Sequence, residues 1–141
     1  MSSKKSKVPS TKSSSCLCGA VQLSVTGNDK GAVVCHCSNC QRASGSAFLH
    51  NYRFTSADLK FTKGEELVRE YEDKETKTGN TLYRHFCEKC GSPLYLKNSA
   101  FPGLVVLHCG TMEAEGPQPS MELFPENKYA WIGDVMGKPR L

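Results

Sequence analysis

Eight cysteines in a chain of 141 residues constrain this sequence more than any other feature. Seven of them fall into three groups: Cys16 and Cys18 as CxC, Cys35, Cys37 and Cys40 as CxCxxC, and Cys87 and Cys90 as CxxC. Alternate residues of an extended strand face the same side, so a CxC pair can direct two sulfurs at one ion. A CxxC turn does the same, and Gly91 permits the left-handed backbone that such a turn needs. Thiols clustered in this way predict metal binding, and they favour zinc over magnesium or calcium.

The simplest division of these ligands gives one closed and one open site. A structural zinc site has four protein ligands, whereas a catalytic site has three and an open position. The closed site would take Cys16, Cys18, Cys87 and Cys90, and the open site Cys35, Cys37 and Cys40. The spacing leaves open whether His36, His50, His108 or Cys109 completes the second site. His36 lies between two ligands, so we expect its side chain to point away from their ion. Two single zinc ions suit this division better than an iron–sulfur cluster.

The residues before the first cysteine differ from the rest of the chain. Residues 1–14 are rich in Ser and Lys and offer little to bury, so we expect a disordered basic tail and not a signal peptide. Its four lysines, Lys4, Lys5, Lys7 and Lys12, account for the whole net charge of +4. Nucleic-acid binding is therefore expected only weakly and only through this tail. Without an export signal or an apolar run long enough for a membrane, we expect a cytoplasmic protein, with a nuclear location as the alternative.

Alternation of apolar and polar residues predicts a mainly β domain. Val21, Leu23 and Val25 alternate with polar residues in the segment 20–27, which is the period of a half-buried strand. Further strands are predicted at 46–54, 66–72, 81–86, 93–97 and 104–109, separated by breaks such as TGNDKG (26–31). We expect one helical turn near Arg42 and another around TSADL (55–59). The prediction is a single domain of several short antiparallel strands over 15–136, with a C-terminal tail at 137–141.

Four segments together resemble the glutathione-dependent formaldehyde-activating enzyme family, which includes centromere protein V. They are CLCGAVQLSV at 16–25, CHCSNCQRASGSAF at 35–48, YRHFCEKCGSPLY at 83–95 and GTMEAEG at 110–116. The resemblance implies a β-tent fold with two zinc ions per chain. It also implies that the four-cysteine site is structural and the three-cysteine site catalytic. The implied activity is that of a carbon–sulfur lyase, which reversibly joins glutathione and formaldehyde into S-hydroxymethylglutathione.

The segment after the three-cysteine site is a candidate pocket for the thiol substrate. Arg42 could attract a carboxylate, Ser44 and Ser46 could hydrogen-bond a ligand, and Gly45 allows close approach of the backbone. The alternative is that this segment only supports the zinc loop. We expect the open position to orient a substrate thiol, because three thiolates weaken zinc as an activator of a carbonyl. The alternative function is a non-catalytic, zinc-stabilised scaffold whose basic tail contacts chromatin or a protein partner.

Overall fold

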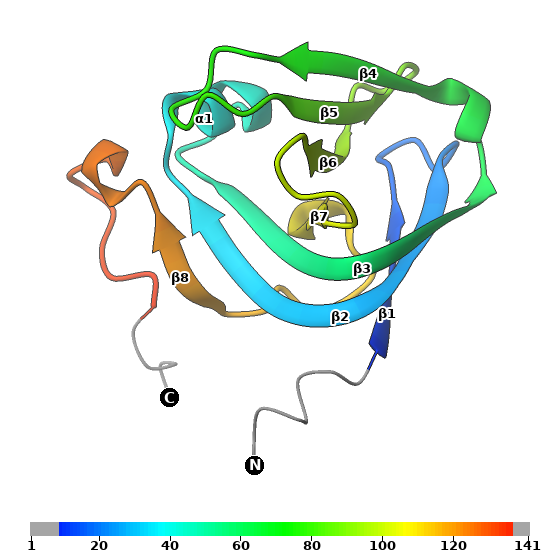
Figure 1. Ribbon diagram of the computed structural model, residues 1–141, viewed down its shortest axis with the longest axis horizontal. Helices are drawn as coiled ribbons and strands as arrows, with labels where there is room; N and C mark the ends of the chain where they lie inside the picture. Colours follow the sequence, from blue (N-terminus) through cyan, green and yellow to red (C-terminus); the bar gives the residue numbers. More distant parts are fainter. Residues whose placement is uncertain (1–8, 137–141) are drawn as a thin grey trace.

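In the computed structural model, which describes residues 9–136, eight strands form one sheet (Figure 1). The strands are β1 (Pro9–Ser15), β2 (Gln22–Cys35), β3 (Leu49–Lys63), β4 (Val68–Asp73), β5 (Leu82–Cys87), β6 (Pro93–Asn98), β7 (Val105–His108) and β8 (Pro119–Leu123). The one α-helix among these residues, α1 (Ser38–Ser44), connects β2 to β3. Short 3-10 turns lie at η2 (Glu65–Leu67), η3 (Cys109–Thr111) and η4 (Pro125–Asn127). The predicted mainly β fold is confirmed.

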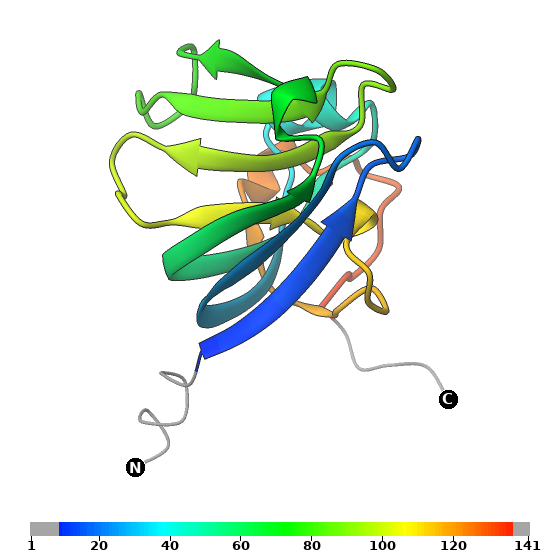
Figure 2. The same ribbon diagram turned by 90° about the vertical axis from the view of Figure 1, so that its right-hand side faces the viewer.

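The strands follow the order β1-β2-β3-β7-β6-β5-β4, and every neighbouring pair on this path is antiparallel. β8 adds a parallel pairing to the far end of β2, at Ala32–Cys35, beyond the part that pairs with β1. Figure 2 shows the strands stacked from β4 at the top to β1 at the bottom. The long strands β2 and β3 bend under the others, so that the sheet curls into an open half-barrel (Figure 1).

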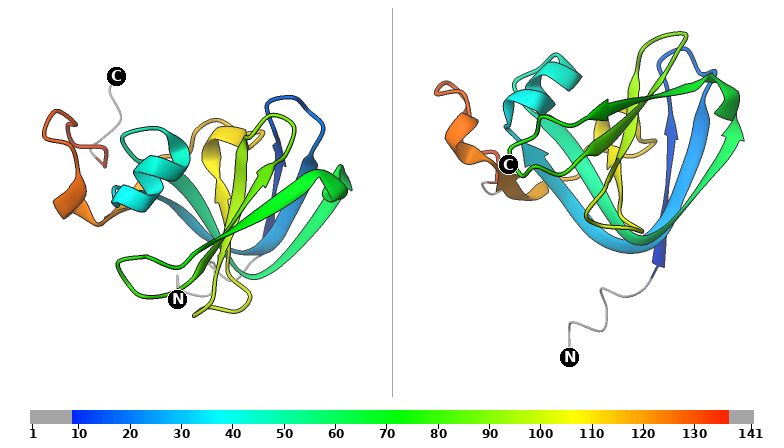
Figure 3. Two further views of the ribbon diagram at one scale, coloured as in Figure 1. Left: turned by 90° about the horizontal axis from the view of Figure 1, so that it is seen from above. Right: turned by 45° about the horizontal axis from the view of Figure 1, so that its top comes forward.

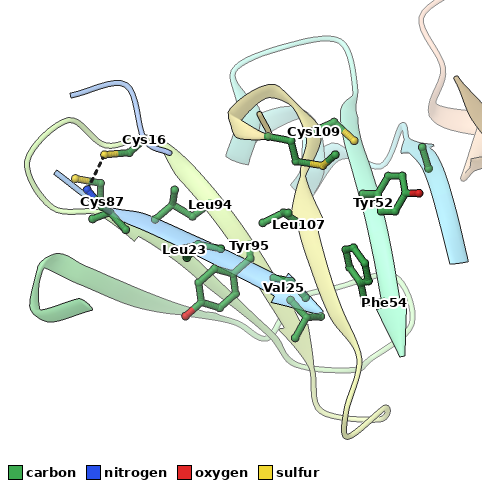
Figure 4. Packing of buried hydrophobic residues seen from close by; sticks show 14 residues of the cluster. Cys16, Leu23, Val25, Tyr52, Phe54, Cys87, Leu94, Tyr95, Leu107 and Cys109 are labelled. Carbon is green, nitrogen blue, oxygen red and sulfur yellow. Dashed lines mark hydrogen bonds between the residues drawn. The ribbon is translucent and has the colours of Figure 1, made fainter. Parts of the chain in front are cut away.

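One face of the curled sheet carries the main hydrophobic core. Phe54, Leu94 and Leu107 are fully buried there, together with Leu23 and Val25 (Figure 4). Burying each such side chain contributes about 1.5–3 kcal/mol. Within residues 9–136, no helix has the length and apolar character to span a membrane.

The opposite face carries a row of residues in which two arginines flank two apolar side chains. Residues directly opposite each other on neighbouring strands share a face. The register pairs Arg53 with Val106, Val106 with Leu96, and Leu96 with Arg84, across β3, β7, β6 and β5. Cys35 pairs with Leu49 of β3. Leu49 and Arg53 are four positions apart in this strand, so their side chains lie on the same face. The sheet therefore brings Arg84 to the face on which the three-cysteine segment begins.

Three local predictions are wrong. Residues 9–14 are not disordered: they form most of β1, because the edge of β2 offers them a backbone partner despite their polar sequence. TGNDKG does not end a strand but is absorbed into β2 as a bulge between Asp29 and Ala32. TSADL is not helical, since it lies within β3 and pairs with β2. Residues 1–8 and 137–141 lie outside the described residues, so the predicted tails stay predictions there.

Candidate metal centres

The four-cysteine group forms where two distant connections meet. Cys16 and Cys18 come from the β1–β2 connection, Cys87 is the last residue of β5, and Cys90 lies in the turn that follows. Their sulfurs all lie within 4.8 Å of one another. The Sγ atoms of Cys16 and Cys18 are 3.6 Å apart, and those of Cys18 and Cys87 are 3.9 Å apart. A tetrahedron with Zn–S bonds of about 2.3 Å puts its sulfurs about 3.8 Å apart. The spacing of the group therefore fits a zinc ion.

Backbone and hydroxyl groups support these sulfurs. The backbone N–H of Val21 donates to Cys16 Sγ at 3.3 Å, a contact drawn beside Cys87 in Figure 4. The Ser92 hydroxyl lies 3.2 Å from Cys90 Sγ, and this contact, together with backbone hydrogen bonds from Cys18 and Ser92, lowers the pKa of that thiol to about 5. Gly91 has the predicted left-handed backbone, with φ of 76°. A backbone hydrogen bond from Ala20 favours the thiolate of Cys18, but burial and the neighbouring cysteines outweigh it and raise the pKa of Cys18 to about 11. The hydrogen bonds therefore favour a thiolate at Cys90 in particular.

The three-cysteine group lies at the junction of β2 and α1, at the end of the sheet away from the β1–β2 connection (Figure 3). Cys35, Cys37 and Cys40 are buried, and their sulfurs also lie within 4.8 Å of one another. Cys37 caps the helix, since its sulfur accepts the backbone N–H of Cys40 at 3.3 Å. The thiol of Cys35, 3.4 Å away, lowers the pKa of Cys37, and its own pKa rises to about 11. These opposite shifts indicate that the neighbouring sulfurs share protons through hydrogen bonds. A bound cation would displace those protons.

The four alternative ligands for this group all lie elsewhere. His36 Nε2 donates to Glu122 Oε1 at 2.8 Å, so its ring points away from the cysteines, as predicted. His50 donates to the carbonyl of Pro117, and His108 Nδ1 donates to Asn51 Oδ1. Cys109 packs in the main core, at the end away from Cys16 and Cys87 (Figure 4). Among residues 9–136, the group consists of three sulfurs with no fourth protein ligand.

A buried ion pair between Arg84 and Asp73 lies next to the three-cysteine group. Arg84 Nε donates to Asp73 Oδ2 at 2.9 Å, and the two side chains are only 11% and 10% exposed. Asn39 Nδ2 donates to both carboxylate oxygens of Asp73, at 2.9 and 3.0 Å, which ties α1 to β4. Burial opposes the charge of Arg84, but Asp73 and the neighbouring Cys40 raise its pKa. The guanidinium is therefore a fixed positive charge beside the thiols.

Sequence reasoning missed Arg84 and Asp73. Arg84 stands in the predicted strand 81–86, and Asp73 follows directly after the predicted strand 66–72 in a run of charged residues. Only the register of β4, β5 and β6 places them on the face that α1 covers. The available signal was an arginine within one predicted strand and an aspartate at the end of the preceding one, since opposite charges can pair across neighbouring strands.

A cavity of about 290 Å³ opens on the three-cysteine group, and we call it the cysteine cavity. Its walls include Cys35, Cys37 and Cys40, whereas none of the residues of the predicted thiol pocket lines it. Arg42, Gly45 and Ser46 line a separate hollow beside Tyr129. Ser44 Oγ donates to the carbonyls of Gln41 and Phe48, which supports the loop. The structure thus places the predicted pocket beside the site but on another surface, and its role as a pocket stays a prediction.

Comparison with known proteins agrees with this geometry. A family model described as "Glutathione-dependent formaldehyde-activating enzyme" matches residues 11–127. A Halomonas elongata protein named "Putative glutathione-dependent formaldehyde-activating enzyme" is 28% identical over 121 residues, which cover 84% of this chain and 77% of that protein. A crystal structure of a Rhodobacter sphaeroides protein superposes with a TM-score of 0.57 over 78% of this chain and 98% of that one. Its identity is 21%, so this likeness concerns the fold alone.

Proposed function

This chain belongs to the glutathione-dependent formaldehyde-activating enzyme family, and on that premise we propose that it is a zinc-dependent carbon–sulfur lyase. The proposed reaction joins a small-molecule thiol, of the glutathione kind, to an aldehyde, as in the formation of S-hydroxymethylglutathione. One observation carries the proposal: Cys35, Cys37 and Cys40 form a buried group of three sulfurs that opens on a cavity. Three ligands and an open position are the pattern of a catalytic zinc.

The proposal assigns one zinc ion to each cysteine group. Cys16, Cys18, Cys87 and Cys90 would hold a structural ion, because four thiolates close a tetrahedral site. Cys35, Cys37 and Cys40 would hold the second, which supplies when bound the positive charge that keeps a substrate thiol deprotonated. Arg84 offsets part of the negative charge of three thiolates.

The chain's own residues then position the reaction. α1 holds Cys37 and Cys40 rigidly, because Asn39 ties the helix to Asp73. In the cysteine cavity, the substrate sulfur would attack the carbonyl carbon. One carbon–sulfur bond forms, the carbonyl π bond breaks, and the proton from the thiol ends on the oxygen, so the step needs no redox partner. We retain Arg42, exposed on α1 two residues after Cys40, as a proposed contact for a thiol substrate's carboxylate outside the cavity.

The cysteines also bear on where the protein works. All eight are free of disulfides. Metal-binding thiols need a reducing environment, so we propose the cytoplasm as the compartment.

The test combines zinc content with catalysis. The zinc-loaded protein should contain two zinc ions per chain and accelerate adduct formation between glutathione and formaldehyde, followed by NMR exchange. Cys40→Ala should retain one ion and lose the acceleration, whereas Cys109→Ala, which removes a buried thiol outside both groups, should keep both. No acceleration over the spontaneous reaction, with several thiols and aldehydes, would contradict the proposal.

The scaffold alternative predicts two zinc ions without catalysis. Lys12 belongs to β1, with its ammonium 5.4 Å from the centre of the Tyr52 ring, so this lysine is part of the fold. Lys4, Lys5 and Lys7 lie outside the described residues. Deleting residues 1–8 and measuring DNA retention at two salt concentrations separates the hypotheses, because phosphate binding weakens steeply with salt.

A further inference from the structure

The wall of the cysteine cavity is mainly apolar around the three sulfurs. Strands β2, β5, β6 and β7 contribute Val33, Leu82, Leu96 and Val106, and the segment after β8 contributes Phe124. No acidic side chain belongs to the wall. A concave apolar site with a few polar groups is the usual form of a small-molecule pocket.

Several polar groups in this wall are already bonded within the protein. Asn51 Oδ1 accepts from His108, and Asn39 Nδ2 donates to Asp73. Lys77 Nζ donates to Glu126 Oε2 at 2.7 Å and to Asn127 Oδ1 at 2.6 Å. Arg53 donates to the carbonyl of Lys30, and only its Nε is buried without a partner among the described residues. Many of the polar groups of the wall are thus already bonded within the protein, and its lining surface is mainly apolar.

The cavity is much larger than a formaldehyde molecule needs. Its 290 Å³ equals the share of liquid volume of about ten water molecules, whereas formaldehyde has only two non-hydrogen atoms. The charged ends of glutathione would not fill the remainder favourably. Two carboxylates and an ammonium group lose their hydration in an apolar cavity, and few free groups there would replace it.

We infer that the aldehyde substrate carries an apolar alkyl or aryl group, which this cavity accommodates next to the three sulfurs. This inference rests on the proposed function and names the substrate class for it. The thiol's sulfur lies in the cavity and its polar remainder points out. The thiol adds across the carbonyl, with its sulfur bonded to the carbon and its proton on the oxygen, to give a hemithioacetal.

The first experiment compares aldehydes with the zinc-loaded protein and glutathione. Hexanal and benzaldehyde should give kcat/KM at least ten times that of formaldehyde, after subtraction of the spontaneous rate. A preference for formaldehyde would overturn this inference and leave the proposed function intact. No acceleration with any aldehyde would overturn both.

Two variants test the location of the apolar group. Leu104→Phe adds bulk to the cavity wall, and it should lower the ratio of hexanal to formaldehyde kcat/KM at least five-fold. Leu59→Phe makes the same change at a half-buried leucine outside this wall, and it should leave the ratio unchanged. Equal ratios in the two variants would overturn the inference.

A binding measurement gives a readout independent of catalysis. Benzyl alcohol, an unreactive apolar probe, should shift the methyl NMR signals of Leu96, Leu104 and Val106 in a saturable manner. Glycerol, as the polar control, should not shift them. Equal effects of the two probes would overturn the inference.

Discussion

At the scale of single residues, Arg84 places a buried positive charge beside the three-cysteine group. It forms a buried ion pair with Asp73 and lies beside Cys40. Removing one partner of a buried pair leaves an uncompensated charge, which costs about 3–5 kcal/mol. We expect Arg84→Gln to lower the free energy of unfolding in urea by about this amount. We also expect it to weaken cobalt binding at the three-cysteine group, followed by absorbance.

Arg69 provides the matched control for this substitution. Its ion pair with Glu88 joins half-exposed side chains, 52% and 37% accessible, and exposed pairs contribute only about 0–1 kcal/mol. Arg69→Gln should therefore have little effect on unfolding and none on cobalt binding. Equal effects of the two substitutions would show that Arg84 has no special role. Arg84→Lys keeps the charge and should restore part of the cobalt affinity.

The same residues show what a sequence can predict at this scale. The structure brings the cysteines together in the two groups that the sequence predicts. Within each motif the cysteines lie two or three residues apart, where local geometry fixes their directions. The union of Cys16 and Cys18 with Cys87 and Cys90 followed instead from counting four ligands for a closed site. Arg84 and Asp73 are eleven residues apart, and strand register brings them together. The cavity wall draws on residues from Val33 to Phe124, so it depends on the whole topology. Periodicity cannot supply that information.

Among the elements, β1 is held by a carboxylate that joins three strands. Asp29 Oδ2 of β2 accepts hydrogen bonds from Ser10 in β1, at 2.9 Å, and from the Tyr52 hydroxyl in β3, at 2.6 Å. Burial alone would raise the pKa of Asp29, but these bonds and the N–H of Gly31 lower it below its ordinary value of 3.8. This polar contact explains how a Ser- and Lys-rich segment becomes a strand.

The lowered pKa makes the contribution of Asp29 depend on pH. A carboxyl with a depressed folded-state pKa stabilises the fold above its unfolded value, and this stability is lost as pH falls through the folded pKa. We expect Asp29→Asn to cost about 1–2 kcal/mol at pH 7. The difference from the parent protein should shrink below pH 3.8, measured by urea unfolding. A difference that stays constant to pH 2.5 would contradict this prediction.

The turn between β3 and β4 depends on Gly64. Its φ is 77°, and an added Cβ would lie 2.0 Å from the carbonyl oxygen of Ala20. We expect Gly64→Ala to lower the free energy of unfolding by more than about 3 kcal/mol. Gly79→Ala is the control, because Gly79 has a φ of 82° but no atom within 4 Å of the added Cβ. It should show only the cost of the left-handed backbone, about 1–2 kcal/mol.

At the scale of the whole molecule, the four-cysteine group connects parts of the sheet that are not neighbouring strands. In strand order, β1 and β5 are separated by four other strands, yet Cys16 and Cys18 meet Cys87 and Cys90. The backbone N–H of Leu17 adds a single hydrogen bond to Ser92 Oγ across this junction. The three-cysteine group makes a different kind of connection, because Cys35, Cys37 and Cys40 all belong to one segment. The first group therefore links distant strands, and the second organises a local site.

This difference predicts unequal effects of losing the two proposed zinc ions. Loss of the ion proposed for the four-cysteine group should loosen the β1–β2 connection from β5, because that ion would join the two and metal binding is coupled to folding. We expect Cys90→Ser to lower Tm by ~10 °C or more and to speed amide hydrogen exchange in β1 and β5. Cys40→Ser should lower Tm less and speed exchange chiefly in α1, while abolishing catalysis. If Cys40→Ser were the more damaging for Tm, the three-cysteine group would be the structural one, and the assignment of the catalytic ion would have to be reversed.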